Sequence, residues 1–236
     1  MSGYYTPEEA QDVFLKANEA YAREDYAAAQ TGYEKLLTNG HGGPDVLYNL
    51  GTTHLARGDV GRAVLALEQA KKEGGRAPDL EANLSVARAR QVDKVVGATV
   101  EEEFLPRVAA ATDGNVVAWT FLGTWVAAFA LLLLWRALRP GRRTGVGVMA
   151  ALLFTVAVPS GLLLATHAWV DATVHEAVVL APTLVARELP QPGARSIFEV
   201  HAGLKVRLLE ETGRFVRIRL PNGLEGWAER EGIAEI

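Results

Sequence analysis

The sequence predicts a multi-domain membrane protein in which an all-α helical repeat, a two-helix transmembrane hairpin and a small all-β barrel follow one another. Three observations support this fold class. The N-terminal part matches itself at a shift of 34 residues, two long runs in the middle are apolar and uncharged, and the C-terminal part alternates short patterned segments with turns. The 236 residues include no cysteine, which excludes disulfides, zinc ribbons, iron–sulfur centres and thiol catalysis.

The N-terminal repetition covers residues 1–96. A shift of 34 residues aligns Ala22-Arg23 with Ala56-Arg57 and Asn49-Leu50 with Asn83-Leu84, without a gap. This is the period of the tetratricopeptide repeat, whose unit is a helix, a turn and a second helix. The N-terminal part is therefore expected to be a tetratricopeptide repeat domain.

The second unit, residues 48–70, resembles that family most closely. Its matching features are Leu50-Gly51, the turn at Gly58-Asp59, and the small residues Ala63 and Ala70. The resemblance implies about two complete repeats, followed by a capping helix from Leu80 to about Val96. Asp25 and Asp59 are expected to cap the helices that begin after them.

Close packing between helices is expected where small residues recur. Gly51 lies in the first helix of its unit, and Ala29 and Ala63 lie in second helices, where a larger side chain would force a pair apart. The bulky Tyr33 and Leu67 are expected to fill the seam between units.

A stack of such units has a concave face that is built from the first helix of each unit, and in tetratricopeptide domains this face typically holds a segment of a partner protein. The residues predicted to point into it are Asn18, Tyr21, Tyr48, Asn49, Thr52, Leu55, Asn83 and Arg90. Asn49 and Asn83 occupy the same place in successive units. Their side chains either bond to the backbone of a partner or bond to neighbouring helix ends.

Residues 97–115 are expected to link the repeats to the membrane part. The predicted spans are 116–135 and 146–168, and each provides the roughly 20 residues that cross a bilayer as a helix. The loop 136–145 between them is basic, and short basic loops remain on the cytoplasmic side. The loop arginines are Arg136, Arg139, Arg142 and Arg143. Both ends of the chain are therefore expected in the periplasm of a bacterial inner-membrane protein.

The N-terminal sequence MSGYYTPEEAQDVF has neither a basic start nor an apolar region, so it is not a signal peptide. Either a signal precedes Met1, or the rule of the basic loop fails here. The apolar runs 116–135 and 146–166 carry no ionisable residue, which excludes a transporter. Small residues recur every four positions at Gly123 and Ala127 and at Ala157 and Gly161, and this spacing allows the spans to pack on each other or on partner helices.

A weak candidate metal site begins at the end of the second predicted span and continues through the expected linker 169–176. His167, Asp171 and His175 are spaced by four residues, so they share one face if the helix continues outward. Such a triplet binds a divalent metal, or it is only a solvated polar face next to the membrane. We expect no metal and no cofactor.

Residues 177–236 read as about five short strands separated by turns, which predicts a small barrel. Alternation is clearest over 215–220, and Asn222-Gly223 is typical of a tight hairpin. The order of elements resembles a bacterial SH3 domain, through the motifs Val185-Ala186-Arg187, His201-Ala202-Gly203 and Glu225-Gly226-Trp227. Within these motifs Arg187 and Trp227 are the candidate binding residues. Trp227 either closes the core or serves as a ligand platform.

The complete arrangement resembles BatE-like proteins of the bacterial aerotolerance operon. The resemblance implies a scaffold in an envelope or oxidative stress complex, with MoxR-type AAA+ ATPases and membrane-anchored von Willebrand A-domain proteins as partners. The sequence contains no P-loop, Gly-x-Ser-x-Gly or His-Glu-x-x-His motif, so we expect no enzyme. Only the short loop is basic, which argues against nucleic acid. The alternative is a wall-binding or wall-sensing membrane protein whose SH3-like domain contacts peptidoglycan.

Overall fold

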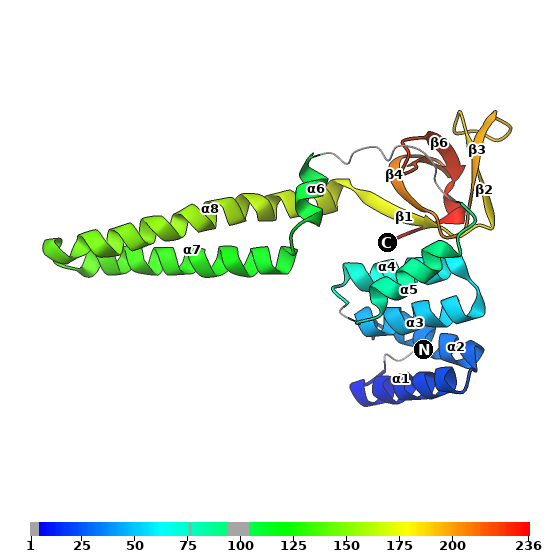
Figure 1. The fold of residues 1–236 in the computed structure, drawn as a ribbon, viewed down its shortest axis with the longest axis horizontal. Coiled ribbons are helices and arrows are strands. Elements are labelled where there is room, and N and C mark those ends of the chain that lie inside the picture. Colours follow the sequence, from blue (N-terminus) through cyan, green and yellow to red (C-terminus); the bar gives the residue numbers. More distant parts are fainter. Residues whose placement is uncertain (1–4, 76, 94–103) are drawn as a thin grey trace. The chain divides into compact units, whose positions relative to one another are not determined.

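The computed structural model describes residues 5–75, 77–93 and 104–236. The chain forms two compact units, whose elements are labelled in Figure 1. One unit combines Met1–Val100 with His175–Ile236, and the other is Glu101–Val174. The second unit is therefore an insertion in the sequence of the first.

Helices alternate with short turns in the N-terminal part of the first unit. They are α1 (Pro7–Ala22), α2 (Tyr26–Thr38), α3 (Pro44–Arg57), α4 (Val60–Lys72) and α5 (Leu80–Ala89). The predicted caps are confirmed, because Asp25 Oδ1 accepts a hydrogen bond from the Ala28 amide and Asp59 Oδ1 accepts one from the Arg62 amide. The expected capping helix is shorter than predicted, since α5 ends at Ala89. Val96 lies outside the described residues.

Small and large residues are distributed in this helical stack as the repeat pattern predicts. Ala29 and Ala63 are fully buried, and so are Tyr33 and Leu67 at the seams. A Cβ atom on Gly51 would lie 2.6 Å from Leu67 Cγ, closer than carbon atoms can approach. The predicted close approach of α3 to α4 is thus confirmed, and it depends on the absence of a side chain at Gly51.

His54 in α3 is buried in the stack and makes the folded unit sensitive to acid. Its Nδ1 has no hydrogen-bond partner among the described residues and lies 3.7 Å from Asp59 Oδ2. Burial lowers the pKa of His54 below its usual value near 6.5, while Asp59 and Glu34 oppose this shift and Arg62 and Arg57 add to it. A lowered pKa means that the unfolded chain takes up a proton before the folded chain does.

We therefore expect the unfolding temperature of the first unit to fall as the pH decreases from 7.5 to 5. His54→Leu removes the group that titrates, and the pH dependence of this variant should be flatter than that of the parent. Thermal unfolding followed by circular dichroism at both pH values provides the measurement. Parallel pH profiles for parent and variant would contradict the assignment to His54.

Residues 175–236 form a seven-stranded antiparallel sheet in the order β3-β2-β6-β5-β4-β1-β7. The strands are β1 (His175–Val179), β2 (Thr183–Arg187), β3 (Ser196–His201), β4 (Lys205–Thr212), β5 (Phe215–Arg219), β6 (Glu225–Glu229) and β7 (Ile233–Glu235). The hairpin predicted at Asn222-Gly223 is confirmed by the antiparallel pairing of β5 with β6.

The prediction of a closed small barrel was wrong. Among the described residues, strand β3 pairs only with β2 and β7 pairs only with β1, so the two ends of the strand order do not meet. One physical reason is length, because β7 has three residues and leaves too short a ladder to close the sheet. Val179, Val216 and Ile218 in the apolar cluster of the sheet are nevertheless fully buried.

The second unit is dominated by two long apolar helices. Its elements are α6 (Phe104–Ala110), α7 (Gly114–Ala137), the short 3-10 helix η1 (Pro140–Arg142) and α8 (Arg143–Thr173). Both α7 and α8 are long and apolar enough to cross a membrane, with mean hydropathies of 2.1 and 2.2 over their most apolar windows. Only 11% of each window is buried within the protein, whereas a core helix of a soluble fold is mostly buried.

The two long helices pack on each other along small residues. Ala128 of α7 and Ala157 of α8 are fully buried, and a Cβ atom on Gly161 would lie 2.9 Å from Phe121 Cε2. Gly123 has open space around it and takes no part in this contact. Of the two packing alternatives, the contact between the two predicted spans, α7 and α8, is therefore present.

Candidate functional site

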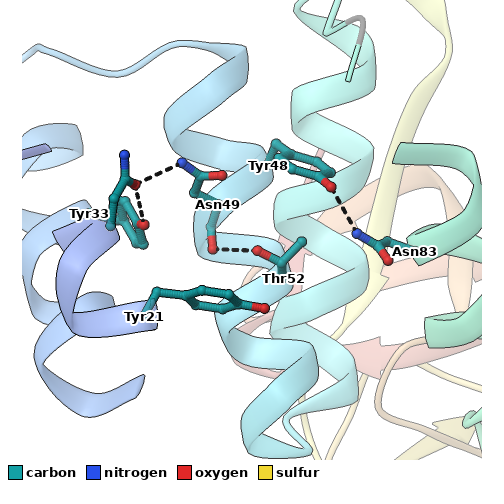
Figure 2. A pocket seen from close by; sticks show the side chains of 7 residues that line it. Tyr21, Tyr33, Tyr48, Asn49, Thr52 and Asn83 are labelled. Atoms are coloured by element: carbon teal, nitrogen blue, oxygen red, sulfur yellow. Dashed lines mark hydrogen bonds between the residues drawn. The ribbon is translucent and has the colours of Figure 1, made fainter. Parts of the chain in front are cut away.

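A pocket of about 360 Å³ opens on the helical stack and is lined by side chains from four of its helices. The lining residues of this amide pocket are Asn18, Tyr21, Tyr33, Tyr48, Asn49, Thr52 and Asn83. All of them are uncharged, and they contribute three carboxamides, three phenols and one hydroxyl. Figure 2 shows the tyrosine rings of Tyr21 and Tyr48 around the pocket, next to the amides of Asn49 and Asn83.

Hydrogen bonds connect the amides and phenols across successive helix pairs. Asn18 Oδ1 accepts from Tyr33 Oη at 2.7 Å and from Asn49 Nδ2 at 3.2 Å. In the next unit Asn83 Nδ2 donates to Tyr48 Oη at 3.1 Å. Asn49 and Asn83 thus bond to side chains of the neighbouring helices, and not to helix ends. Because each amide uses only part of its capacity in these bonds, polar groups remain for a ligand.

Two of the phenols in the pocket, those of Tyr33 and Tyr48, have raised pKa values. Burial raises the pKa of Tyr33 to about 12, and burial followed by the nearby Asp79 raises the pKa of Tyr48 above its usual value. Both hydroxyls therefore remain protonated at neutral pH. The pocket can exchange hydrogen bonds with a polar backbone and pack aromatic rings against it.

Six of the eight residues predicted for the concave face line this pocket, namely all except Leu55 and Arg90. Leu55 was misplaced, because it is buried in the apolar cluster of α3, α4 and α5. Arg90 follows α5, and its Nη1 donates to the Leu55 carbonyl at 2.9 Å. Tyr33 was assigned only to the seam between units. The polar hydroxyl of Tyr33, which an apolar seam would leave without a partner, was the signal that this residue also reaches the pocket.

A second feature was absent from the sequence predictions: the helical stack packs directly against the sheet. Val178, Leu180 and Ile236 of the sheet share one apolar cluster with Leu80 and Leu84 of α5. We call this contact the helix–sheet joint, formed by α4, α5 and residues 91–93 on one side and by β1, β4, β7 and the turn 201–203 on the other. The two soluble parts of the chain therefore belong to one body.

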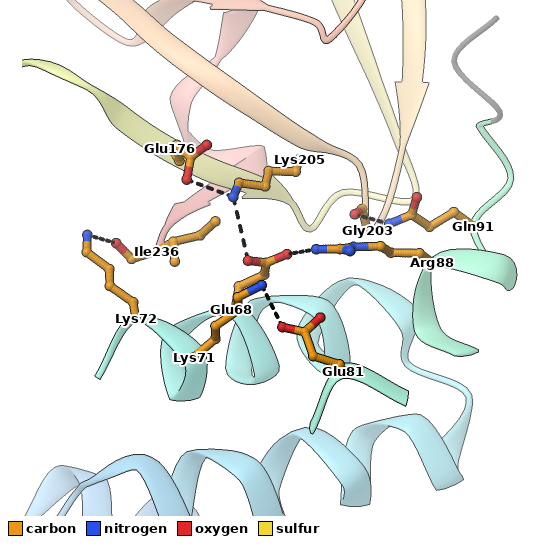
Figure 3. Close-up of polar contacts among 10 residues, drawn as sticks. All are labelled: Glu68, Lys71, Lys72, Glu81, Arg88, Gln91, Glu176, Gly203, Lys205 and Ile236. Carbon is orange, nitrogen blue, oxygen red and sulfur yellow. Dashed lines mark hydrogen bonds and ion pairs between the residues drawn. The ribbon is translucent and has the colours of Figure 1, made fainter. Parts of the chain in front are cut away.

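A buried carboxylate lies at the centre of the joint, as Figure 3 shows. Glu68 of α4 is only 5% exposed. Its Oε1 accepts from Arg88 Nη2 at 2.5 Å, and its Oε2 lies 3.5 Å from Lys205 Nζ. Lys205 is also paired with Glu176 Oε2 at 2.7 Å. At the other end of the joint, Lys72 Nζ donates to the Ile236 carbonyl at 2.7 Å.

The residues after α5 are tied to the turn between β3 and β4. Asp93 accepts the His201 amide at 2.5 Å through Oδ2, and its Oδ1 lies 2.8 Å from His201 Nδ1. Gln91 Nε2 donates to the Gly203 carbonyl. The sequence predicted only a turn of the β domain at the His201-Ala202-Gly203 motif. The small residues Ala202 and Gly203 were the one sign that another element, here α4, packs closely against this turn.

The remaining sheet candidates have structural partners. Arg187 of β2 lies opposite Trp227 of β6, and Arg187 Nη1 donates to the Ala194 carbonyl at 3.1 Å. Trp227 is half-buried. A Cβ atom on Gly226 would lie 2.9 Å from Ala186 Cβ, so β6 approaches β2 closely at that point.

The candidate metal triplet is not assembled. Helix α8 ends at Thr173, so His175 begins β1 and does not continue the helical face of His167 and Asp171. His167 Nε2 is instead 2.8 Å from Thr112 Oγ1. Within residues 5–75, 77–93 and 104–236, no group of three His, Asp or Glu side chains could hold a metal ion. The condition for a shared face of all three residues is not met, because α8 ends before His175.

The arginines between the two apolar helices gather around the η1 turn. Arg136 lies at the end of α7, Arg139 precedes η1, and Arg142 ends it. Arg143 Nε donates to the Leu138 carbonyl at 2.7 Å, and its guanidinium lies 5.4 Å from the centre of the Trp135 ring. The loop is therefore compact, with positive charge and an indole at the same end of the hairpin.

Comparison of the chain with known protein families, with curated protein sequences and with solved structures finds no match in any of the three.

Proposed function

We propose that this protein is a non-catalytic scaffold of the bacterial inner membrane, which binds a partner segment in its tetratricopeptide-type amide pocket and a second protein on its SH3-like sheet. The observation that carries the proposal is the amide pocket itself. Its uncharged amides and phenols suit the backbone of an extended segment, and its lining supplies no pair of groups for acid–base or nucleophilic chemistry.

The fold of the first unit supports a two-span topology. The segments before and after the inserted helices pack together in the helix–sheet joint, so they lie on the same side of any membrane. An even number of crossings between them is then required, and α7 and α8 are both long and apolar enough to supply two. The arginines around η1 favour the cytoplasm for the loop, and this supports a periplasmic location for the amide pocket and the sheet.

The resemblance to BatE-like proteins suggests the partners. On this proposal the amide pocket holds a segment of a membrane-anchored von Willebrand A-domain protein, in a complex that also includes a MoxR-type AAA+ ATPase and responds to envelope or oxidative stress. A single short pocket gives modest affinity, so a second contact through the sheet strengthens the assembly.

The topology is tested with single cysteines, which the cysteine-free chain makes unambiguous. Ser85→Cys in α5 and Ser196→Cys in β3 should react with a membrane-impermeant maleimide in intact spheroplasts. Thr144→Cys, beside the η1 turn, should react only after lysis. Labelling of all three in intact spheroplasts would show that the helices do not span, and the reverse pattern would place the pocket in the cytoplasm.

The partner is tested with a photo-crosslinking amino acid in place of Tyr21, which lines the amide pocket and is 36% exposed. The matched control is the same substitution at Leu15, which lies on the same helix, is 51% exposed and is not part of the lining. We expect a von Willebrand A-domain protein to be cross-linked from position 21 only. Equal cross-linking from both positions would contradict a role for the pocket. Retention of the full chain on purified sacculi would instead favour the wall-binding alternative.

A further inference from the structure

The last helix of the stack has few stabilising features of its own. Helix α5 has ten residues, and the side chain of its N-cap residue, Asp79, makes no capping hydrogen bond. Its buried residues are Leu80, Leu84 and Ala87. Helices of this length are marginal in water without tertiary packing. The order of α5 must therefore come from its neighbours.

The sheet supplies contacts at the C-terminal end of α5. Arg88, in the last turn, bonds to Glu68, and Glu68 is in turn paired with Lys205 of β4. Directly after the helix, Gln91 and Asp93 bond to the turn 201–203. The end of α5 is thus held on one side by α4 and on the other by the sheet.

The joint is closely packed at this point. A Cβ atom on Gly61 of α4 would lie 3.2 Å from Ala202 Cβ and 3.2 Å from the Val179 carbonyl oxygen. On the opposite side, a Cβ atom on Gly203 would lie 3.0 Å from Val60 Cγ1, and Gly203 has a φ of +97°, which disfavours any other residue. Each surface therefore has a glycine where the other surface approaches it. Such close packing is typical of a specific interface between two parts of a folded domain.

We propose that the docked sheet acts as the cap of the helical stack and holds α5 in its helical, packed state. Asn83 of α5 forms the last wall of the amide pocket and bonds to Tyr48. The sheet thereby positions one wall of a pocket that it does not line. The consequence for partner binding rests on the proposed function, whereas the capping of the stack does not. The experiment measures only the hydrogen-exchange protection of α5.

The test is amide hydrogen exchange of the full chain in detergent micelles, with the joint disturbed from the sheet side. In Ala202→Trp an indole replaces a methyl group that faces Gly61, and the joint cannot close around it. We expect the amides of α5 to exchange at least about tenfold faster than in the parent, while those of α1, β5 and β6 keep their protection. Ser196→Trp, at the opposite end of β3, is the matched control and should leave α5 unchanged.

Two further variants keep the test decisive if Ala202→Trp unfolds the sheet, which faster exchange in β5 and β6 would reveal. Lys205→Gln removes one partner of Glu68 and should speed exchange in α5 by a smaller factor. The pair Gly61→Cys with Ala202→Cys should form a disulfide between helix and sheet, detected as the loss of two free thiols, whereas Gly61→Cys with Ser196→Cys should not. Unchanged α5 exchange in both Ala202→Trp and Lys205→Gln, with the sheet still protected, would overturn the proposal.

Discussion

Replacing Arg88 with methionine is expected to lower the free energy of unfolding of the first unit by roughly 2–3 kcal/mol, because it leaves the buried Glu68 carboxylate poorly compensated. Methionine keeps the apolar stem of the arginine and removes only the charge. Lys205 cannot take its place fully, since it lies 3.5 Å from Glu68 and is shared with Glu176. Urea unfolding of the detergent-solubilised chain, followed by circular dichroism, measures the effect.

The control for this prediction is an exposed ion pair on the same helices. Lys71 Nζ lies 2.6 Å from Glu81 Oε1, with side chains 49% and 64% exposed. Glu81→Gln should change the free energy of unfolding by less than about 1 kcal/mol, because water solvates both groups when the pair is broken. Similar losses for Glu81→Gln and Arg88→Met would show that burial of Glu68 is not what makes the interaction strong.

The second large effect is expected at the contact between Gly51 and Leu67. Gly51→Ala places a methyl group 2.6 Å from Leu67 Cγ and 3.1 Å from the Leu67 amide nitrogen, so α3 and α4 must move apart. We expect a loss of about 2 kcal/mol for this overpacking. Leu67→Ala removes a fully buried side chain and should lose about 3 kcal/mol.

The double variant distinguishes a specific clash from general damage to the helices. With alanine at both positions the new methyl group occupies part of the space that Leu67 vacated, so the combined loss should be smaller than the sum by about 1–2 kcal/mol. Ser85→Ala, at the equivalent and exposed position of α5, should have little effect. Strict additivity of the Gly51 and Leu67 substitutions would mean that their contact is not the source of the strain.

The parts of this fold that could be predicted from the sequence are those with local or periodic signals. Asp25 and Asp59 cap helices through amides three residues away, and the 34-residue period repeats the small residues that paired helices need. The two apolar helices are visible in composition alone. Most of the pocket was also predictable, because Asn49 and Asn83 recur at one place in successive units.

The parts that could not be predicted depend on contacts between distant segments. The sheet would close only if β3 paired with β7. No residue in either strand indicates from the sequence whether this pairing forms. In the sequence, Glu68 looks like an ordinary exposed charge on an amphipathic helix. Its partner Lys205 follows the inserted helices in the sequence, so only the fold shows that the two side chains meet. The metal triplet failed for a similar reason, since the end of α8 at Thr173 carries no strong stop signal.

The helix–sheet joint can form only late in the synthesis of the chain. The surface of α4 and α5 that the sheet covers leaves the ribosome well before the residues that cover it, because the whole hairpin is made in between. At synthesis rates of about 5–20 residues per second, the stack waits on the order of ten seconds for its final contact. During that interval Val60 and the Glu68 carboxylate, which contact the sheet in the folded unit, are open to water and to chaperones. A nascent chain stalled before His175 should therefore be captured or degraded more readily than one stalled after Ile236.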